Sequence, residues 1–211
     1  MQNNRLHTDR KKLRSFLTLL FPPGETKRYN SQRGGSMKTQ IQSDLPNFPS
    51  EVITTWIEPF AQTIGWPPCD NDHSLPTNDW KYILIKRPLQ FWKALKWNKQ
   101  EFHLSANSLS QKSLESVSSL VLGAVQNESN LFTISIPDYK ERFEGIVKYL
   151  KLNFIFPTPP IVLKENSVYH ILDGNHRMAA YLYGNGYFKV DLDNDLLANL
   201  YKNQSYWVAE L

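Results

Sequence analysis

A run of strand, turn and helix signals in the last third of this chain constrains its fold more than any other feature. Apolar residues at 160–163 and an alternating pattern at 168–172 predict two strands, and Asn166-Ser167 between them predicts a hairpin. Asp173-Gly174 then predicts a turn. A helix is expected over residues 175–183. The sequence therefore predicts a hairpin followed by a tight turn and a helix.

The rest of the chain mixes helix and strand signals. Phe143, Ile146 and Leu150 recur at spacings of three and four residues, which indicates the apolar face of a helix. Because helices and strands are interspersed, we expect a compact mixed α/β (α+β) domain with a small mixed sheet flanked by helices. Helices are expected at residues 49–64, 113–125 and 137–150, and further strands at residues 82–85, 131–136 and 188–192.

Basic charge is concentrated at the beginning of the chain. Residues 1–50 hold nine Lys or Arg against three Asp or Glu, whereas residues 51–211 hold fifteen against seventeen. We therefore expect residues 1–50 to be a basic, partly disordered extension. Residues 51–79 are expected to form a helix and a linker that pack on the core, and residues 80–211 the compact mixed α/β domain.

Two interpretations of the basic segment 1–36 are open. It is either a solvated run of charge or a short amphipathic helix that contacts phosphates or anionic lipid. Pro22-Pro23-Gly24 and the Ser/Gly-rich stretch 31–36 have linker composition, and Met37 resembles a second start. A deletion to Met37 would separate the two interpretations.

The apolar runs and the cysteine content of the chain indicate the compartment in which we expect the protein. Hydrophobic residues make up 41% of the sequence, which is enough to bury a core, but no run approaches the roughly 20 apolar residues that a membrane span needs. The apolar run 15–21 lacks the cleavage site of a secretory signal. Cys69 is the one cysteine, which excludes a disulfide within the chain and favours a reducing compartment. We expect a cytoplasmic protein without a membrane span.

A second candidate surface is the aromatic-basic segment 80–102. One interpretation is a DNA-binding face, with amines on phosphates and rings under bases. The other is an amphipathic element whose rings belong to the core and whose lysines face water. The segment contains Lys81, Lys86, Arg87, Lys93, Lys96 and Lys99, interleaved with Trp80, Tyr82, Phe91, Trp92, Trp97 and Phe102.

The predicted turn at Asp173-Gly174 carries the strongest chemical signal. Unpaired backbone N–H groups at the start of the following helix would point toward one place, where the helix dipole favours negative charge. His176 and Arg177 in the first turn would add cationic donors, and an arginine at a helix N-terminus favours an anion nearby. The alternative is a plain Asp-Gly turn with an asparagine cap at Asn175 and a surface arginine.

The residues around this turn resemble a known signature. The run Asp-Gly-Asn-His-Arg-x-Ala-Ala at 173–180, preceded by Pro-Pro-Ile-Val-Leu at 159–163 and a hairpin, is similar to the ParB/sulfiredoxin superfamily, in which a Gly-x-x-Arg core holds nucleotide phosphate. The likeness is specific over residues 159–186. It extends to Glu101 if residues 102–104 form the opening strand of the family.

Two departures from the family reduce the number of activities that the resemblance implies. The catalytic cysteine of sulfiredoxins would fall at Asn175, so peroxiredoxin repair is not expected. Chromosome-partition ParB proteins carry Glu-Arg-Arg where this chain has Asn175-His176-Arg177, and they continue into a helix-turn-helix domain that we do not expect after Leu211.

The resemblance that remains is to stand-alone catalytic modules, and it implies that residues 80–211 are a ParB/sulfiredoxin-like catalytic domain. These include plasmid fertility-inhibition proteins of the oncogenic-suppression type, which the resemblance associates with ATP hydrolysis and DNA cleavage. It therefore implies a nucleotide hydrolase, and a possible metal-dependent nuclease, that uses a nucleoside triphosphate and a divalent metal of the Mg²⁺ type. A non-catalytic nucleotide- or DNA-binding protein and a kinase of a small hydroxyl compound such as free serine are the alternatives.

If the resemblance holds, each residue of the turn has an expected role. Gly174 and the N–H groups of Asn175 and His176 would hold an anionic oxygen, and Arg177 would neutralise charge on the phosphoryl group. Asp173 would orient a donor or bind the metal. His176 would act as a general acid or a phosphate donor. Glu115 and Glu128 are the candidate bases that activate water.

Overall fold

The computed structural model describes residues 36–126, 138–188 and 203–211. The chain divides into two compact units, the first ending at Lys96 and the second beginning at Trp97. The second unit therefore begins later than residue 80, where the sequence places the boundary. Each unit is described by itself below.

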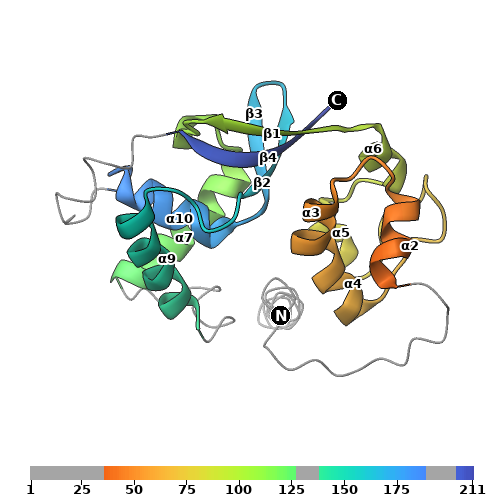
Figure 1. Cartoon of the computed structure of the whole chain (residues 1–211), viewed down its shortest axis with the longest axis horizontal. Helices are drawn as coiled ribbons and strands as arrows, with labels where there is room; N and C mark the ends of the chain where they lie inside the picture. Colours follow the sequence, from red (N-terminus) through yellow and green to blue (C-terminus); the bar gives the residue numbers. More distant parts are fainter. Residues whose placement is uncertain (1–35, 127–137, 189–202) are drawn as a thin grey trace, which may run out of the picture. The chain divides into compact units, whose positions relative to one another are not determined.

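The described part of the first unit is helical (Figure 1). The expected helix at 49–64 is confirmed, since three successive helical segments fill residues 50–64 and the middle one has π-helical hydrogen bonding. The elements are α2 (Met37–Asp44), α3 (Ser50–Val52), η1 (Ile53–Ile57), α4 (Glu58–Ile64), α5 (Trp80–Ile83) and α6 (Leu89–Ala94).

Folded structure in this unit begins earlier than residue 51. The side chain of Ser36 caps α2 by accepting a hydrogen bond from the backbone N–H of Thr39 at 3.3 Å. Ile41 and Leu45 are fully buried. Residues 36–50 therefore belong to the folded unit and differ from the extension that their charge suggested.

The strand expected at 82–85 is wrong, because helix α5 begins at Trp80 and ends at Ile83. Trp80 and Ile83 stand three residues apart and are both buried, so the periodicity that the fold uses is helical. A short apolar run does not distinguish the two periods, which explains the error.

The second unit contains a four-stranded sheet in the order β1-β4-β2-β3 (Figure 1). Strand β2 pairs with β3 in antiparallel and with β4 in parallel orientation, so the sheet is mixed, as expected. The strands are β1 (Lys96–Phe102), β2 (Ile161–Glu165), β3 (Val168–Asp173) and β4 (Gln204–Glu210), and the helices are η2 (Ala106–Ser108), α7 (Gln111–Gln126), α9 (Tyr139–Asn153) and α10 (Asn175–Gly184).

Most elements expected for this unit are confirmed. The helices at 113–125, 137–150 and 175–183 correspond to α7, α9 and α10, and the strands at 160–163 and 168–172 correspond to β2 and β3. The strand expected at 131–136 lies outside the described residues, as does that at 188–192 apart from Phe188, which lies in a bend. The sequence did not predict β4, and β1 ends where the resemblance placed an opening strand.

The predicted hairpin is also confirmed. Asn166 and Ser167 connect β2 to β3 with φ angles of 49° and 68°, and Glu165 pairs with Val168 across the turn. A two-residue turn with positive φ angles at both residues has a twist that matches the twist of the two strands it connects.

The core of the second unit lies between the sheet and the helices α7, α9 and α10, which gather on one side of it (Figure 1). Val162 and Tyr206 are buried from the sheet, and Val121 and Tyr181 are buried from the helices. This packing fixes the start of α10 against the end of β3. None of the helices in the described part of the chain is long and apolar enough to cross a membrane.

The residue before α7 and the first turn of that helix close the outer edge of β3. The backbone N–H of Ser110 donates to the carbonyl of Tyr169 at 2.9 Å. The backbone N–H of Ile171 donates to the hydroxyl of Ser113, also at 2.9 Å. Two backbone groups that face away from β2 are therefore paired with residues 110–113.

Candidate functional site

The turn between β3 and α10 requires a glycine for two separate reasons. Gly174 has a φ angle of 99°, which side-chain-bearing residues rarely adopt. A Cβ at this position would also lie 3.0 Å from the guanidinium of Arg177 and 3.0 Å from the Cβ of Pro160. The predicted Asp-Gly turn is present, and the space beside it is filled by an arginine.

The beginning of α10 has the backbone geometry that a phosphate site needs. The carbonyl of Gly174 accepts the first helical hydrogen bond, from the N–H of Met178 at 2.9 Å. Within the described part of the chain, the N–H groups of Asn175 and Arg177 form no hydrogen bond. These donors lie at the positive end of the helix dipole and are suited to an anion.

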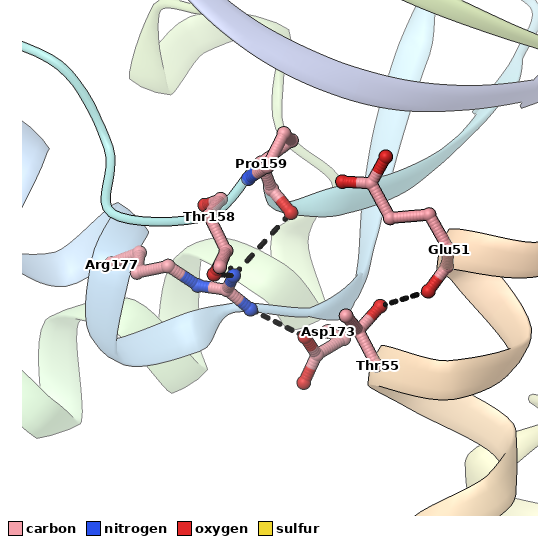
Figure 2. A network of polar contacts seen from close by, with 6 residues as sticks. All are labelled: Glu51, Thr55, Thr158, Pro159, Asp173 and Arg177. Carbon is pink, nitrogen blue, oxygen red and sulfur yellow. Dashed lines mark hydrogen bonds and ion pairs between the residues drawn. The ribbon is translucent and has the colours of Figure 1, made fainter.

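Arg177 makes a set of contacts with its own chain, as Figure 2 shows. Its Nη1 donates to the carbonyls of Thr158 at 3.0 Å and Pro159 at 3.3 Å, and also to the hydroxyl of Thr158. Its Nη2 forms an ion pair with Asp173. The side chain is only 13% exposed. The guanidinium therefore ties the segment that enters β2 to the turn that leaves β3.

The sequence suggested that the guanidinium of Arg177 is available to an anionic ligand, and the observed arrangement differs from this. Asp173 already balances the charge of Arg177, so an incoming anion would have to share the guanidinium with the carboxylate or replace it. The Asp173 side chain is 29% exposed, and its Oδ1 accepts no hydrogen bond in the part of the chain that the structure describes. Asp173 therefore remains accessible from solvent at the turn.

His176 lies inside the protein and does not supply positive charge near neutral pH. The residue is 4% exposed. Burial is the main cause that lowers its pKa to about 4; Arg142 and Arg177 lower the pKa further, while Asp138 opposes them. A neutral imidazole differs from the cationic phosphate donor that the sequence suggested.

No contact in the described residues connects either candidate base, Glu115 or Glu128, with the turn between β3 and α10. Glu115 is exposed on α7 and accepts a hydrogen bond from Gln111 on the same helix at 2.9 Å. It forms no hydrogen bond or ion pair with Asp173 or Arg177 in the described residues. Glu128 lies outside those residues.

Asp173 is the acidic residue of the turn that could hold a divalent metal. Among the described residues, no three His, Cys, Asp or Glu side chains are grouped as a metal site would require. Mg²⁺ is commonly bound by one or two carboxylates together with the phosphates of a substrate, so a lone carboxylate fits a metal that arrives with a nucleotide.

The aromatic-basic segment 80–102 separates into buried and surface residues. Trp80 and Trp92 are buried, and Trp92 packs edge-on against Trp56 with ring centroids 5.5 Å apart. These two rings belong to the core, as the amphipathic interpretation expects. Lys86, Arg87 and Lys96 are exposed.

Thr158 and Pro159 are the site residues that the sequence analysis did not identify. Their role depends on a contact between segments nearly twenty residues apart, which no local pattern encodes. The ion pair between Asp173 and Arg177 could have been predicted from the sequence, because side chains four residues apart lie on the same side of a helix.

Comparisons of the chain with protein-family models, with curated proteins and with solved structures found no match.

Proposed function

We propose that the chain binds the phosphate groups of a nucleotide at the turn between β3 and α10. The observation that carries the proposal is the meeting of three features at one glycine: donors of the first turn of α10, the guanidinium of Arg177, and a backbone that leaves no room for a side chain at Gly174. The resemblance of residues 173–180 to the ParB/sulfiredoxin signature supports a nucleotide as the ligand.

The ion pair between Asp173 and Arg177 sets how such a ligand would bind. A phosphate oxygen that approaches the first turn of α10 would compete with Asp173 for the Nη2 donors of Arg177. The carbonyl contacts from Thr158 and Pro159 would hold the guanidinium in place during this exchange. Arg177 would therefore be positioned before the ligand arrives, which lowers the entropic cost of binding.

Hydrolysis of the bound nucleotide, with DNA cleavage as a further activity, is the second proposal. The accessible Oδ1 of Asp173 favours it, because Asp173 could hold Mg²⁺ together with phosphate oxygens. Such a metal would supply neutralisation of the phosphate charge. Arg177 would stabilise charge on the phosphoryl group, and the neutral His176 would keep the space behind the turn free of water rather than act as an acid.

The binding proposal is tested by calorimetry with a non-hydrolysable ATP analogue. Arg177→Lys keeps the charge but removes the forked donor geometry, so we expect affinity to fall about tenfold. The matched control is Arg142→Lys, because Arg142 on α9 forms an ion pair of the same four-residue spacing with Asp138, the residue that precedes this helix. Equal affinities for both variants and the wild type, or no binding by any of them, would overturn the proposal.

Asp173→Asn distinguishes binding from hydrolysis. Without metal, removal of the competing carboxylate should maintain or tighten binding of the analogue. If Asp173 holds Mg²⁺ during hydrolysis, the same variant should lose metal-dependent phosphate release. No phosphate release by the wild type with any nucleotide and divalent metal would remove the hydrolase proposal and leave the binding proposal standing.

A further inference from the structure

The segment between α9 and β2 begins with a turn that a side chain of β4 closes. Helix α9 ends at Asn153, and Phe154 then adopts a left-handed conformation with a φ angle of 60°. The Nε2 of Gln204 donates to the carbonyl of Phe154 at 2.8 Å. The backbone N–H of Phe156 donates to the Oε1 of the same side chain at 2.9 Å. This pair of bonds, here called the Gln204 clamp, ties the turn after α9 to β4.

The Gln204 clamp lies inside the protein. Gln204 is fully buried, and a buried amide that both donates and accepts is held in one orientation. Phe156 is buried beside it and packs against Tyr181 and Tyr206, with ring centroids 5.4 Å and 5.7 Å apart. The position of Phe156 is therefore fixed by polar and aromatic contacts together.

The chain that follows Phe156 is stiff as far as the contacts of Arg177. Three of the four residues at 157–160 are prolines, whose rings restrict φ. The backbone N–H of Trp207, also on β4, donates to the carbonyl of Pro160 at 2.9 Å. The two carbonyls that accept hydrogen bonds from Arg177 lie between these two contacts with β4. Strand β4 therefore fixes the segment that holds the guanidinium.

These contacts determine which donors of Arg177 remain for a ligand (Figure 2). Its Nη1 donates to Thr158 and Pro159, and its Nη2 is paired with Asp173. Its Nε forms no hydrogen bond in the part of the chain that the structure describes. Nε and Nη2 both lie beside Gly174, since a Cβ there would be 3.0 Å from each. An anion that replaces Asp173 would meet this edge of the guanidinium, whose two donors match two oxygens of one phosphate group.

We propose that Gln204 is a positioning residue of the candidate nucleotide site, and that it acts through residues 154–160 to present the Nε–Nη2 edge of Arg177 to a phosphate group. The proposal rests on the proposed function, because it assumes that the turn between β3 and α10 binds a nucleotide. Without the Gln204 clamp, the carbonyls that hold Nη1 would move with the segment. The guanidinium would then be ordered only when the ligand binds, which weakens binding.

The first test follows the guanidinium of Arg177 by ¹⁵N NMR in the full chain without nucleotide. The variant is Gln204→Met, which keeps a similar volume but lacks the amide donor and acceptor. Hydrogen bonds to Nη1 and Nη2 should slow rotation of the guanidinium in the wild type, so the two nitrogens should give separate signals. We expect these signals to merge in the variant. The signals of Arg177 are assigned by their loss in Arg177→Lys.

Glu210→Gln is the matched control for Gln204→Met. Glu210 lies at the other end of β4, and its ion pair with Lys164 at 3.3 Å does not involve the segment before β2. This control should keep the separate signals of the wild type. Pro157→Gly is a second variant, which loosens the segment at an exposed position and should also merge the signals. It keeps the test decisive if circular dichroism shows that Gln204→Met is unfolded.

The second test is calorimetry with the non-hydrolysable ATP analogue. We expect Gln204→Met to bind the analogue about three- to tenfold more weakly than Glu210→Gln, because a side chain must be ordered on binding. Separate Arg177 signals in both Gln204→Met and Pro157→Gly would overturn the proposal. No binding by the wild type would overturn the proposed function, whereas the NMR measurement would still decide whether Gln204 positions Arg177.

Discussion

Two sharp turns of this protein use positive charge in opposite ways. At the turn before α10, Gly174 supplies the left-handed conformation and the guanidinium of Arg177 packs over it, paired with Asp173. At the turn before α6, Ile85 and Lys86 adopt the left-handed conformation without a glycine, and the cations rest on aromatic rings. The first arrangement pairs a cation with a carboxylate, whereas the second places two cations against aromatic rings.

The difference teaches that an arginine near a turn is not by itself a ligand site. Arg177 can bind an anion only by exchange with Asp173, so its selectivity depends on how well the ligand replaces a carboxylate. The cations at the turn before α6 lie against rings, and the strained residue there, Lys86, is exposed. Predictions that change one turn and leave the other intact separate these two behaviours.

The largest effect is expected from Gly174→Ala, which breaks the first turn. The new Cβ would have a strained φ angle and would lie 3.0 Å from both Arg177 and Pro160. Left-handed strain and overpacking together should lower the free energy of unfolding by about 2–4 kcal/mol. Urea denaturation measures the loss.

Gly145→Ala on α9 is the matched control for this substitution. Apart from its chain neighbours and the backbone of its own helix, a Cβ at Gly145 would have no atom within 4 Å. Alanine is favoured over glycine within a helix, so stability should rise by about 0.5–1 kcal/mol. A loss at Gly174 no larger than the change at Gly145 would contradict the steric account of the turn.

The second effect concerns His176, which lies in the first turn of α10. Burial lowers its pKa from 6.5 to about 4 in the folded protein, so the unfolded chain takes up a proton first as the pH falls. Folding stability is therefore lost between about pH 6.5 and pH 4, and the loss from pH 7 to pH 5 should be about 2 kcal/mol.

His176→Gln should remove this part of the acid sensitivity, as measured by denaturation at pH 7 and pH 5. His73→Gln in an exposed loop of the first unit is the control and should keep the acid sensitivity of the wild type. Identical pH profiles for the wild type and the His176 variant would show that the imidazole is not buried in the neutral form.

The smallest effect is expected from Lys86→Gly, which relaxes the second turn. Glycine adopts the φ angle of 58° without strain, so the free energy of unfolding should rise by about 0.5–1 kcal/mol while one cation is removed. Lys148→Gly on α9 is the control, because the same substitution within a helix should lower stability by about 1 kcal/mol. Thermal unfolding compares the two, and a loss in both variants would contradict the account of strain at Lys86.

The sequence predicted those parts of the fold that depend on local pattern. The hairpin at Asn166-Ser167 and the start of α10 carry turn residues that permit few conformations. Strand β4 was missed although its residues alternate in burial over most of its length. The error at residues 82–85 arose because a short apolar run suits either period, and the packing of Trp80 decided in favour of the helix.

The sequence predicted where in the chain the candidate site lies, but it did not predict the contacts that its side chains make. The glycine turn and the first turn of α10 lie where the sequence placed them. The charge of His176 and the contacts of Arg177 could not be predicted, because they depend on helix α9 and on Thr158, which approach the turn only through tertiary packing.

The two serines at the start of α7, Ser110 just before it and Ser113 in its first turn, have a consequence for association between chains. A sheet can grow when a strand from another molecule pairs with an exposed edge. At β3 this route is blocked, because Ser110 and Ser113 occupy backbone groups that a foreign strand would need. Replacing Ser113 would leave the N–H of Ile171 available to such a strand, so a hydroxyl group on a neighbouring helix helps to protect this protein from edge-to-edge aggregation.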